Sequence, residues 1–453
     1  MTAVPPARTA VSTGASATFR EAGDSSATRP LTKAQRLTLL VLPTLMALGP
    51  WASLSPGSEL APTAFRVLLV LAALPAVSGV VRHWRTMPSA VRLALWATGV
   101  LIVWGAVSLL WSADMAFGLR IEVSLLIGLA SMVVMLGLAQ GTDEGVGALR
   151  WGYVLALLVT GGIALWEFRT GQHLTDVTAE QGPYLFSKTA VSASLGNPNN
   201  FGAFLLSTLG PLLVLLARAR HVLTLGLWAG ALGLLMFLTV QTESRAAVGG
   251  LVAMMVLAML LLAFINIGYL FMGLLAGGIV YVTVLTFLGP QVQGVVDRLT
   301  DTGQDKADQL RLDLTSDALT QFASTGGLGT GMGAFQAVLE ATPDRLARQI
   351  VPAHNTLAQV AAENGVIGLA AFVGVLVACA SVLFLRGGGA VAASNRFEIV
   401  LVLIALGVSM IVASYMLNHA ELWVNIGYML CLVWNVQRHR QQTGHAAPER
   451  IAA

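Results

Sequence analysis

The sequence predicts an all-α, polytopic integral membrane protein, and its composition is the first reason. Of the 453 residues, 56% are hydrophobic and only 11% are charged, and the mean hydropathy is +0.74. Soluble domains carry about 25% charged residues. A membrane-spanning helix takes about 20 apolar residues, so this chain has material for about a dozen spans. The composition therefore excludes a water-soluble globular enzyme, a disordered chain and a disulfide-stapled secreted domain.

Long apolar windows are the second reason, and they predict about twelve membrane-spanning helices. The predicted spans are 37–55, 63–81, 93–111, 119–138, 149–167, 198–217, 222–240, 246–265, 267–288, 364–385, 397–416 and 420–436. The predicted regions are a flexible cytoplasmic tail over 1–36, helices one to nine over 37–288, a large, partly helical extracytoplasmic loop over 289–362, helices ten to twelve over 363–436 and a second cytoplasmic tail over 437–453.

The distribution of basic residues predicts the orientation, because loops rich in Lys and Arg stay in the cytoplasm. The predicted cytoplasmic residues are Arg20, Arg29, Lys33 and Arg36, then Arg82, Arg85 and Arg92, then Arg150, then Arg218 and Arg220, then Arg386 and Arg396, and finally Arg438 and Arg440. The intervening short loops SLSPGSELAPT, SADMAFG and LNHAEL contain no Lys or Arg. We therefore expect a multi-pass protein of the cytoplasmic membrane with both termini inside. The net charge of +3 then reflects contact with the lipid bilayer and requires no nucleic acid partner.

Two predicted outer segments, about 168–197 and 289–362, are too long to be turns, and long loops are usually functional. In the second, KADQLRLDLTSDALTQF predicts an amphipathic helix with Leu310, Leu314, Ala318 and Phe322 on one stripe. The following GGLGTGMG lacks the Lys-Ser/Thr ending of a phosphate loop, so we expect a flexible turn rather than a nucleotide site. Neither Cys379 and Cys431 nor the histidines have metal-ligand spacing, so no metal or other cofactor is expected.

Two arginines are candidates for binding an anion on the outer side. Arg245 lies in QTESRAAVGG, where the seventh span ends, although other short outer connections avoid Arg. An arginine at this depth is costly unless it is paired or hydrated. The alternatives are a snorkelling anchor and an anion ligand at the mouth of a cavity. Arg311 opens the amphipathic helix, and its local sequence favours a solvated charge paired with Asp308 or Asp313.

Other polar residues lie where the two outer segments enter the membrane. His354 precedes the tenth span in PAHNTLAQVAAENG, and histidine is the side chain best suited to accept a proton near neutral pH. A structural role is the alternative. Asn197, Asn199 and Asn200 occur in LGNPNNFGAFLL, where capping of the sixth span is the default and orientation of a polar substrate is the alternative.

Several motifs together resemble the O-antigen ligase and Wzy-type polysaccharide polymerase family, including its teichuronic acid polymerase-like members. They are VSLLWSAD, GNPNNFGAFLL, TESRAAVGGL, RLDLTSDALTQF with GLGTGMGAF, and AHNTLAQVAAENGVIGL. The resemblance covers residues 95–435. It implies an integral-membrane glycosyltransferase that takes glycan from an undecaprenyl diphosphate carrier and passes it to a glycan or lipid-glycan acceptor on the outer side, without a metal.

The resemblance also implies roles for particular residues. Arg245 and Arg311 would face the diphosphate, and His354 would act as the base in an inverting transfer. Asn355 and Glu363 would orient the histidine or the acceptor, although Glu363 could equally be a charge on a helix surface. The long Ala/Ser/Thr/Arg tail departs from a standard ligase, and the composition suggests a high-GC genome. A source without an outer membrane has no lipid A core to act as acceptor, and polymerisation of a teichuronic-acid-like or capsular polysaccharide is then favoured over ligation.

Two other functions are weighed against this one. A transporter or flippase of lipid-linked glycan would need charged or polar residues near the middle of the bilayer, and the centres of the predicted helices are almost free of them. A peptidoglycan-type glycosyltransferase would be distinguished by its consumption of lipid II.

Overall fold

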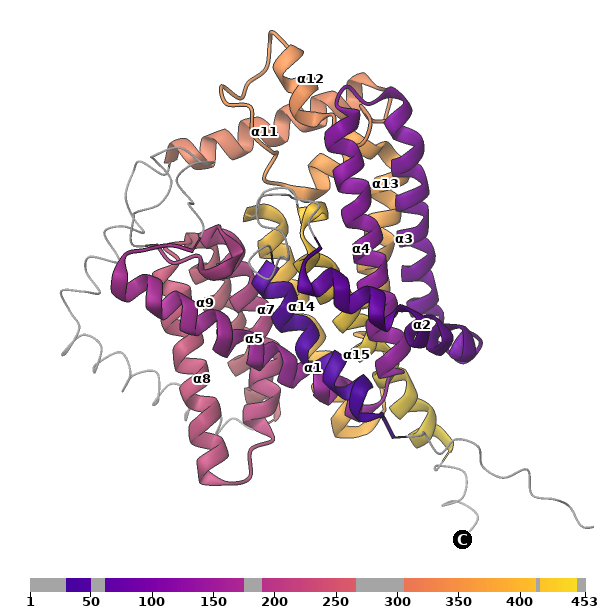
Figure 1. Cartoon of the computed structure of the whole chain (residues 1–453), viewed down its shortest axis with the longest axis vertical. Helices are drawn as coiled ribbons and strands as arrows, with labels where there is room; N and C mark the ends of the chain where they lie inside the picture. Colours follow the sequence, from indigo (N-terminus) through magenta and orange to yellow (C-terminus); the bar gives the residue numbers. More distant parts are fainter. Residues whose placement is uncertain (1–29, 50–61, 175–189, 266–304, 413–415, 446–453) are drawn as a thin grey trace, which may run out of the picture. The chain divides into compact units, whose positions relative to one another are not determined.

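The computed structural model describes residues 30–49, 62–174, 190–265, 305–412 and 416–445, and the elements assigned in them are helices (Figure 1). The chain divides into Met1–Pro30 and Leu31–Ala453, and all these helices belong to the second part. They are α1 (Lys33–Leu48), α2 (Ala64–His83), α3 (Ser89–Ser108), η2 (Leu109–Trp111), α4 (Met115–Ala139), α5 (Asp143–Thr170), η3 (Ala193–Leu195), α7 (Pro198–Ala217), α8 (Val222–Gln241), α9 (Arg245–Ile265), α11 (Asp305–Ser324), α12 (Phe335–Ala341), α13 (Thr356–Ala380), α14 (Gly389–Val412), η5 (Met416–Asn418) and α15 (Ala420–His445).

Eight of these helices are long and apolar enough to cross a membrane, so a helical multi-pass fold is confirmed. They are α2, α3 with η2, α4, α5, α7, α8, α13 and α14. Helix α9 contributes a shorter apolar stretch, Arg245–Leu261, and α1 is 16 residues long. The span predicted at 267–288 lies outside the described residues. The total of twelve spans therefore stays a prediction.

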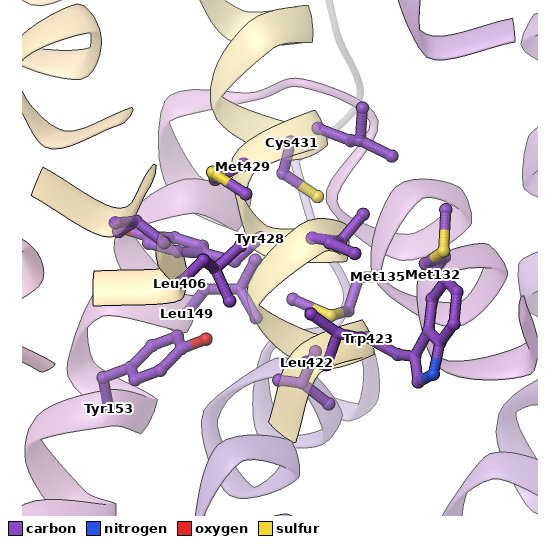
Figure 2. Packing of buried hydrophobic residues seen from close by; sticks show 14 of the residues in the cluster. Met132, Met135, Leu149, Tyr153, Leu406, Leu422, Trp423, Tyr428, Met429 and Cys431 are labelled. Atoms are coloured by element: carbon purple, nitrogen blue, oxygen red, sulfur yellow. The ribbon is translucent and has the colours of Figure 1, made fainter. Parts of the chain in front are cut away.

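Helix α15 lies at the centre of the packing. It contacts α1, α3, α4, α5, α13 and α14, and every residue from Glu421 to Val436 is buried. Figure 2 shows Trp423 and Tyr428 of this helix among Met132 and Tyr153 of neighbouring helices. At Gly128 of α4 a Cβ would lie 2.4 Å from the Trp423 ring, so only glycine admits the indole there. Small residues at such contacts let membrane helices approach closely.

Hydrogen bonds between distant segments gather the predicted cytoplasmic residues at one end of the bundle. The Leu31 N–H donates to Glu144 (3.0 Å), Asn435 donates to Asp143 (2.8 Å) and Arg440 donates to the carbonyl of Arg386 (2.8 Å). We call this the basic end. It unites the first described residues, the α4–α5 connection, the segment after α13 and the last turns of α15, as alternating spans require.

The opposite end carries the long connections, and we call it the loop end. The Ser194 hydroxyl donates to the Ala47 carbonyl (2.7 Å), the Val191 N–H donates to the Gln241 carbonyl (3.0 Å) and the Trp111 indole N–H donates to the Gly329 carbonyl (3.1 Å). The segment before α7, the α8–α9 turn and the region around α11 therefore share one end of the bundle. That the loop end faces the outside of the cell stays a prediction.

The amphipathic helix predicted in the large loop is confirmed as α11. Leu314 and Ala318 are fully buried, while Leu310 and Phe322 are partly buried. The stripe therefore faces protein, as its spacing of three to four residues predicts.

The helix predicted at 364–385 begins earlier, because α13 starts at Thr356. Gly365, with φ 62° and ψ −162°, interrupts the helix close to the predicted start. The residues before this kink, TLAQVAAEN, carry amide and carboxyl groups, so an apolar window excludes them. They nevertheless form helix because they pack against the loop rather than against lipid.

Candidate active site

A small apolar core at the loop end holds the candidate residues of the large loop. It joins α11, α12, the segment after α12 and the first turns of α13. Its buried members are Leu314, Ala318, Phe335, Leu339, Ala347, Ala353, Ala358 and Ala362, and Leu310 and Val351 pack against it. Five of these eight are alanines, so the backbones lie close together.

The glycine-rich segment is a fixed turn on α13, which differs from the flexible turn that the sequence suggested. Gly327, Gly329, Gly331 and Gly333 all have positive φ angles, which glycine adopts without steric cost. The Gly331 N–H donates to the Glu363 carbonyl (2.9 Å), and a Cβ at Gly329 would lie 2.5 Å from that same oxygen. The glycines are therefore required for a close backbone approach to the kink of α13.

Glu363 is the side chain that anchors this turn. It is fully buried and accepts hydrogen bonds from the Gly333 N–H (3.0 Å), the Phe335 N–H (3.4 Å) and the Gln359 amide (3.1 Å). A charge on a helix surface, one of the alternatives for this residue, is therefore wrong. Two of these hydrogen bonds come from the backbone of the loop, and a role of Glu363 in binding substrate stays a prediction.

Asp317 of α11 acts in the same way on the segment after α12. It is 7% exposed, and its carboxylate accepts the backbone N–H groups of Leu346 (3.0 Å) and Ala347 (2.8 Å). Hydrogen bonds from a carboxylate to backbone N–H groups are charge-assisted and strong. Asp317 thus fixes the segment that leads to His354, and sequence reasoning did not single it out.

The two candidate arginines share one carboxylate. Arg245 is the first residue of α9 and Arg311 lies in the second turn of α11. Nη1 of Arg311 lies 3.2 Å from Oδ1 of Asp308, and Nη1 of Arg245 lies 4.0 Å from Oδ2 of the same residue. Both arginine side chains are 31% exposed. The pairing of Arg311 with Asp308 is one of the sequence alternatives, whereas the approach of Arg245 to the same group is visible only in the fold.

His354 lies between the small core and α13. It is partly buried, and its φ of 49° is in the left-handed region, which is uncommon for residues other than glycine. Ala353 on one side belongs to the core that also contains Leu314, so the histidine and the α11 segment that carries Arg311 rest on one cluster. Backbone strain of this kind clusters at functional sites.

Asn355 is the N-cap of α13. Its side chain accepts the N–H of Ala358 at 3.2 Å, which satisfies one of the free donors of the first turn. The cap accounts for this asparagine without a substrate, and a further role in orienting His354 stays a prediction.

The first turn of α7 lies beside the turn that carries Arg245. A Cβ at Gly202 would lie 2.6 Å from the Cβ of Ala247 and 3.6 Å from Oγ1 of Thr242, so α7 and α9 touch at glycine. The motifs GNPNNFGAFLL and TESRAAVGGL therefore meet in space. Glu167 of α5 supports this junction, because its buried carboxylate accepts the N–H groups of Ser192 and Ala193 at 2.9 and 2.8 Å.

Of the asparagines at this junction, Asn197 is the N-cap of α7, and its side chain accepts the Asn199 N–H at 2.8 Å. The default expectation of capping is therefore confirmed for Asn197. Asn199 and Asn200 are buried, and Oδ1 of Asn200 has no hydrogen-bond partner among the described residues. Binding of a polar substrate by Asn197 or Asn199 stays a prediction.

Arg150 is not a loop residue, as the sequence suggested, but part of a buried network near the basic end. Its guanidinium donates to the Glu398 carboxylate at 2.9 and 2.6 Å and to Asn395 at 2.6 Å, and Tyr428 donates to the same carboxylate. Asn395 donates in turn to Asn435. Arg150 and Glu398 lie at the ends of the spans predicted at 149–167 and 397–416, so the expectation of almost uncharged helix centres is not contradicted by this pair. No local pattern could reveal a pair 248 positions apart.

Comparison with protein families gives one result. Residues 229–373 match the family model described as O-antigen ligase. The matched region includes Arg245, Arg311, His354, Asn355 and Glu363, whereas Asn197 and Asn199 precede it. No curated protein matches the chain. Among the residues that the structure describes, no group of three or more His, Cys, Asp or Glu side chains could hold a metal ion.

Proposed function

We propose that this protein, a member of the O-antigen ligase and Wzy-type family, transfers glycan from an undecaprenyl diphosphate carrier to an acceptor hydroxyl on the outer side of the cytoplasmic membrane. The family match supports a ligase or polymerase of cell-surface polysaccharide, acting on a lipid-linked donor and a glycan acceptor. We favour the polymerase because a source without an outer membrane would offer no lipid A core as the acceptor for a ligase.

The observation that carries this proposal is the approach of Arg245 and Arg311 to a single carboxylate. The two residues come from different helices, and both keep about a third of the side chain exposed. Guanidinium groups bind phosphate oxygens with two parallel hydrogen bonds each, so a pair of them suits a diphosphate. An anion bound here would contact both arginines and would take the position that the Asp308 carboxylate now occupies between them.

The helix dipoles add to this preference for negative charge. Arg245 opens α9, and α7 begins beside it at Pro198. The N-terminus of a helix carries roughly half a positive charge. The arginine pair and the helix N-termini both stabilise negative charge. They therefore favour the leaving diphosphate, whose negative charge increases as the glycosidic bond breaks.

His354 supplies the proton acceptor in this proposal. The acceptor hydroxyl loses its proton to the imidazole as its oxygen attacks the anomeric carbon, and the bond from that carbon to the diphosphate breaks on the opposite side. The proton leaves on His354, the electron pair of the broken bond leaves with undecaprenyl diphosphate, and the anomeric configuration inverts. The cationic guanidinium groups take the part that a metal ion plays in other phosphate chemistry, so we propose a metal-independent enzyme.

A transporter or flippase of lipid-linked glycan is the second candidate, and the buried pair of Arg150 and Glu398 favours it. Charged residues inside a bundle often mark an ion or substrate pathway. The guanidinium of Arg150, however, is held by both Glu398 and Asn395, as expected of a structural pair.

The test uses the purified full-length protein with undecaprenyl diphosphate-linked oligosaccharide, followed by analysis of glycan length and of released undecaprenyl diphosphate. We expect longer glycan, and we expect His354→Ala to lower kcat by about 10²- to 10⁴-fold, the usual contribution of a general base. His419→Ala, at another partly exposed histidine of the loop end, is the matched control. Undiminished product from His354→Ala would remove the base assignment, and transport into vesicles without new glycosidic bonds would favour the flippase.

A further inference from the structure

Asp308 lies at the centre of the arginine pair, and neither the family match nor the sequence motifs give it a role there. Its Oδ1 is 3.2 Å from Arg311, and its Oδ2 approaches Arg245 to 4.0 Å, so each carboxylate oxygen faces a different arginine. The two arginines alone would carry a charge of about +2, and the Asp308 carboxylate lowers the net charge of the cluster to about +1. Asp308 is thus the only carboxylate that the described residues place within 4.0 Å of both guanidinium groups.

We propose that Asp308 is a positioning residue that holds Arg245 and Arg311 together while no donor is bound, and that the diphosphate of the donor displaces it. This inference rests on the proposed function, because it assigns the arginines to the diphosphate. In the absence of donor, the carboxylate lies between the guanidiniums where the diphosphate oxygens would bind. It thereby keeps α9 and α11 at the spacing that the donor requires.

The exposure of Asp308 makes it displaceable. Its side chain is 57% exposed, in contrast to the carboxylates of Glu363 and Asp317, which are buried and bound to backbone N–H groups. A solvent-exposed ion pair contributes little to stability, whereas the loss of one partner from a buried pair is strongly destabilising. A ligand can therefore replace Asp308 without disrupting the fold.

The displaced carboxylate also has a favourable place to go. Asp308 lies within the first four residues of α11, which begins at Asp305. Negative side chains are stabilised near helix N-termini, so the side chain can rotate towards water and remain close to positive potential. A diphosphate, with more negative charge than one carboxylate and two groups able to accept paired hydrogen bonds, is the stronger ligand for two guanidiniums.

This arrangement predicts opposite effects on binding and turnover. The remaining charge of Asp308 repels the bound diphosphate, which weakens donor binding and assists the release of undecaprenyl diphosphate after transfer. Removal of the charge without a change of shape, as in Asp308→Asn, should lower KM for the donor and also lower kcat, because the product leaves more slowly. A residue with a purely structural role would instead raise KM or lower protein stability.

The experiment measures the binding of farnesyl diphosphate, a short prenyl diphosphate, to the purified full-length protein by calorimetry. We expect Asp308→Asn to bind it about 3- to 30-fold more tightly, as removal of one like charge a few ångströms away predicts in a partly exposed site. Asp308→Glu, which keeps the charge, should stay within about twofold of the wild type. Asp313→Asn is the matched control, because it removes the same charge from the same helix but pairs with Gln309.

The outcomes separate this inference from the proposed function. If Arg245→Ala and Arg311→Ala weaken binding but Asp308→Asn binds no more tightly than the wild type, the displacement of Asp308 is wrong and the diphosphate site remains. If the arginine variants bind farnesyl diphosphate as well as the wild type does, the proposed diphosphate site itself is wrong. Equal tightening by Asp313→Asn would show a general charge effect and would also overturn the specific role of Asp308.

Discussion

The arginines at the two ends of the bundle are used in opposite ways. Near the basic end, Arg150 is 3% exposed and binds both Glu398 and Asn395 at hydrogen-bond distance. At the loop end, Arg245 and Arg311 are each 31% exposed and share the carboxylate of Asp308. One arginine is therefore held by two partners inside the protein, whereas the other two lie near one exposed carboxylate that they share.

The difference shows what distinguishes a structural arginine from one that can bind a ligand: whether buried protein groups already occupy its hydrogen-bond donors. A buried charge is tolerated only when it is paired and hydrogen-bonded. Removal of one partner leaves the other charge buried and unpaired, which lowers the stability of the fold. A partly exposed arginine that shares an exposed carboxylate with a second arginine remains able to bind a ligand. The comparison therefore predicts that substitution of a buried, fully hydrogen-bonded charge changes stability and that substitution of the exposed arginine pair changes activity.

The largest expected effect is on stability, at Arg150. Arg150→Met leaves Glu398 buried without its guanidinium, and removal of one partner of a buried pair costs about 3–5 kcal/mol. Thermal unfolding of the purified protein in detergent checks this. The double variant Arg150→Met with Glu398→Gln should recover much of the loss, and Arg220→Met, at an exposed arginine of the same end, should change little. A fully stable single variant would break the comparison.

The next effect is on activity, at the shared pair. Arg311→Ala and Arg245→Ala should each lower kcat/KM for the lipid-linked donor by about 10²- to 10³-fold, the effect of removing one donor to a developing negative charge. The unfolding temperature should stay close to that of the wild type. Arg348→Ala, at an exposed arginine of the same loop, is the control. Lysine at either position should restore only part of the activity, because it lacks the paired donors.

The smallest effect is expected at Glu363, which lies at the loop end but is saturated like Arg150. Glu363→Gln turns one acceptor oxygen into an amide donor that faces backbone N–H groups, which costs about 1–3 kcal/mol. Faster hydrogen exchange over residues 327–335 would report the loosened glycine turn. Glu340→Gln, at an exposed carboxylate of α12, is the matched control. Normal exchange in the glycine turn of Glu363→Gln would remove the anchoring role.

The candidate site was predictable where the signal was local. The amphipathic stripe of α11, the cap at Asn197 and the start of α7 at Pro198 all follow from the spacing of a few neighbouring residues. The start of α13 was predicted too late because its first turns are polar yet buried by the loop. Asp308 was foreseen only as a local partner of Arg311, since the position of Arg245 depends on how α9 packs.

The sequence by itself determined that this chain is helical and spans a membrane, because hydropathy and periodicity are properties of a continuous stretch of about 20 residues. Its motifs also indicated the O-antigen ligase family, whose model matches residues 229–373. The tertiary structure decided which polar groups meet: Arg245 with Asp308, Glu363 with the glycine turn, and Arg150 with Glu398. These partners lie far apart along the chain, and a buried polar group must find a partner wherever packing provides one. Which arginine is structural and which can bind a ligand is therefore a property of the fold.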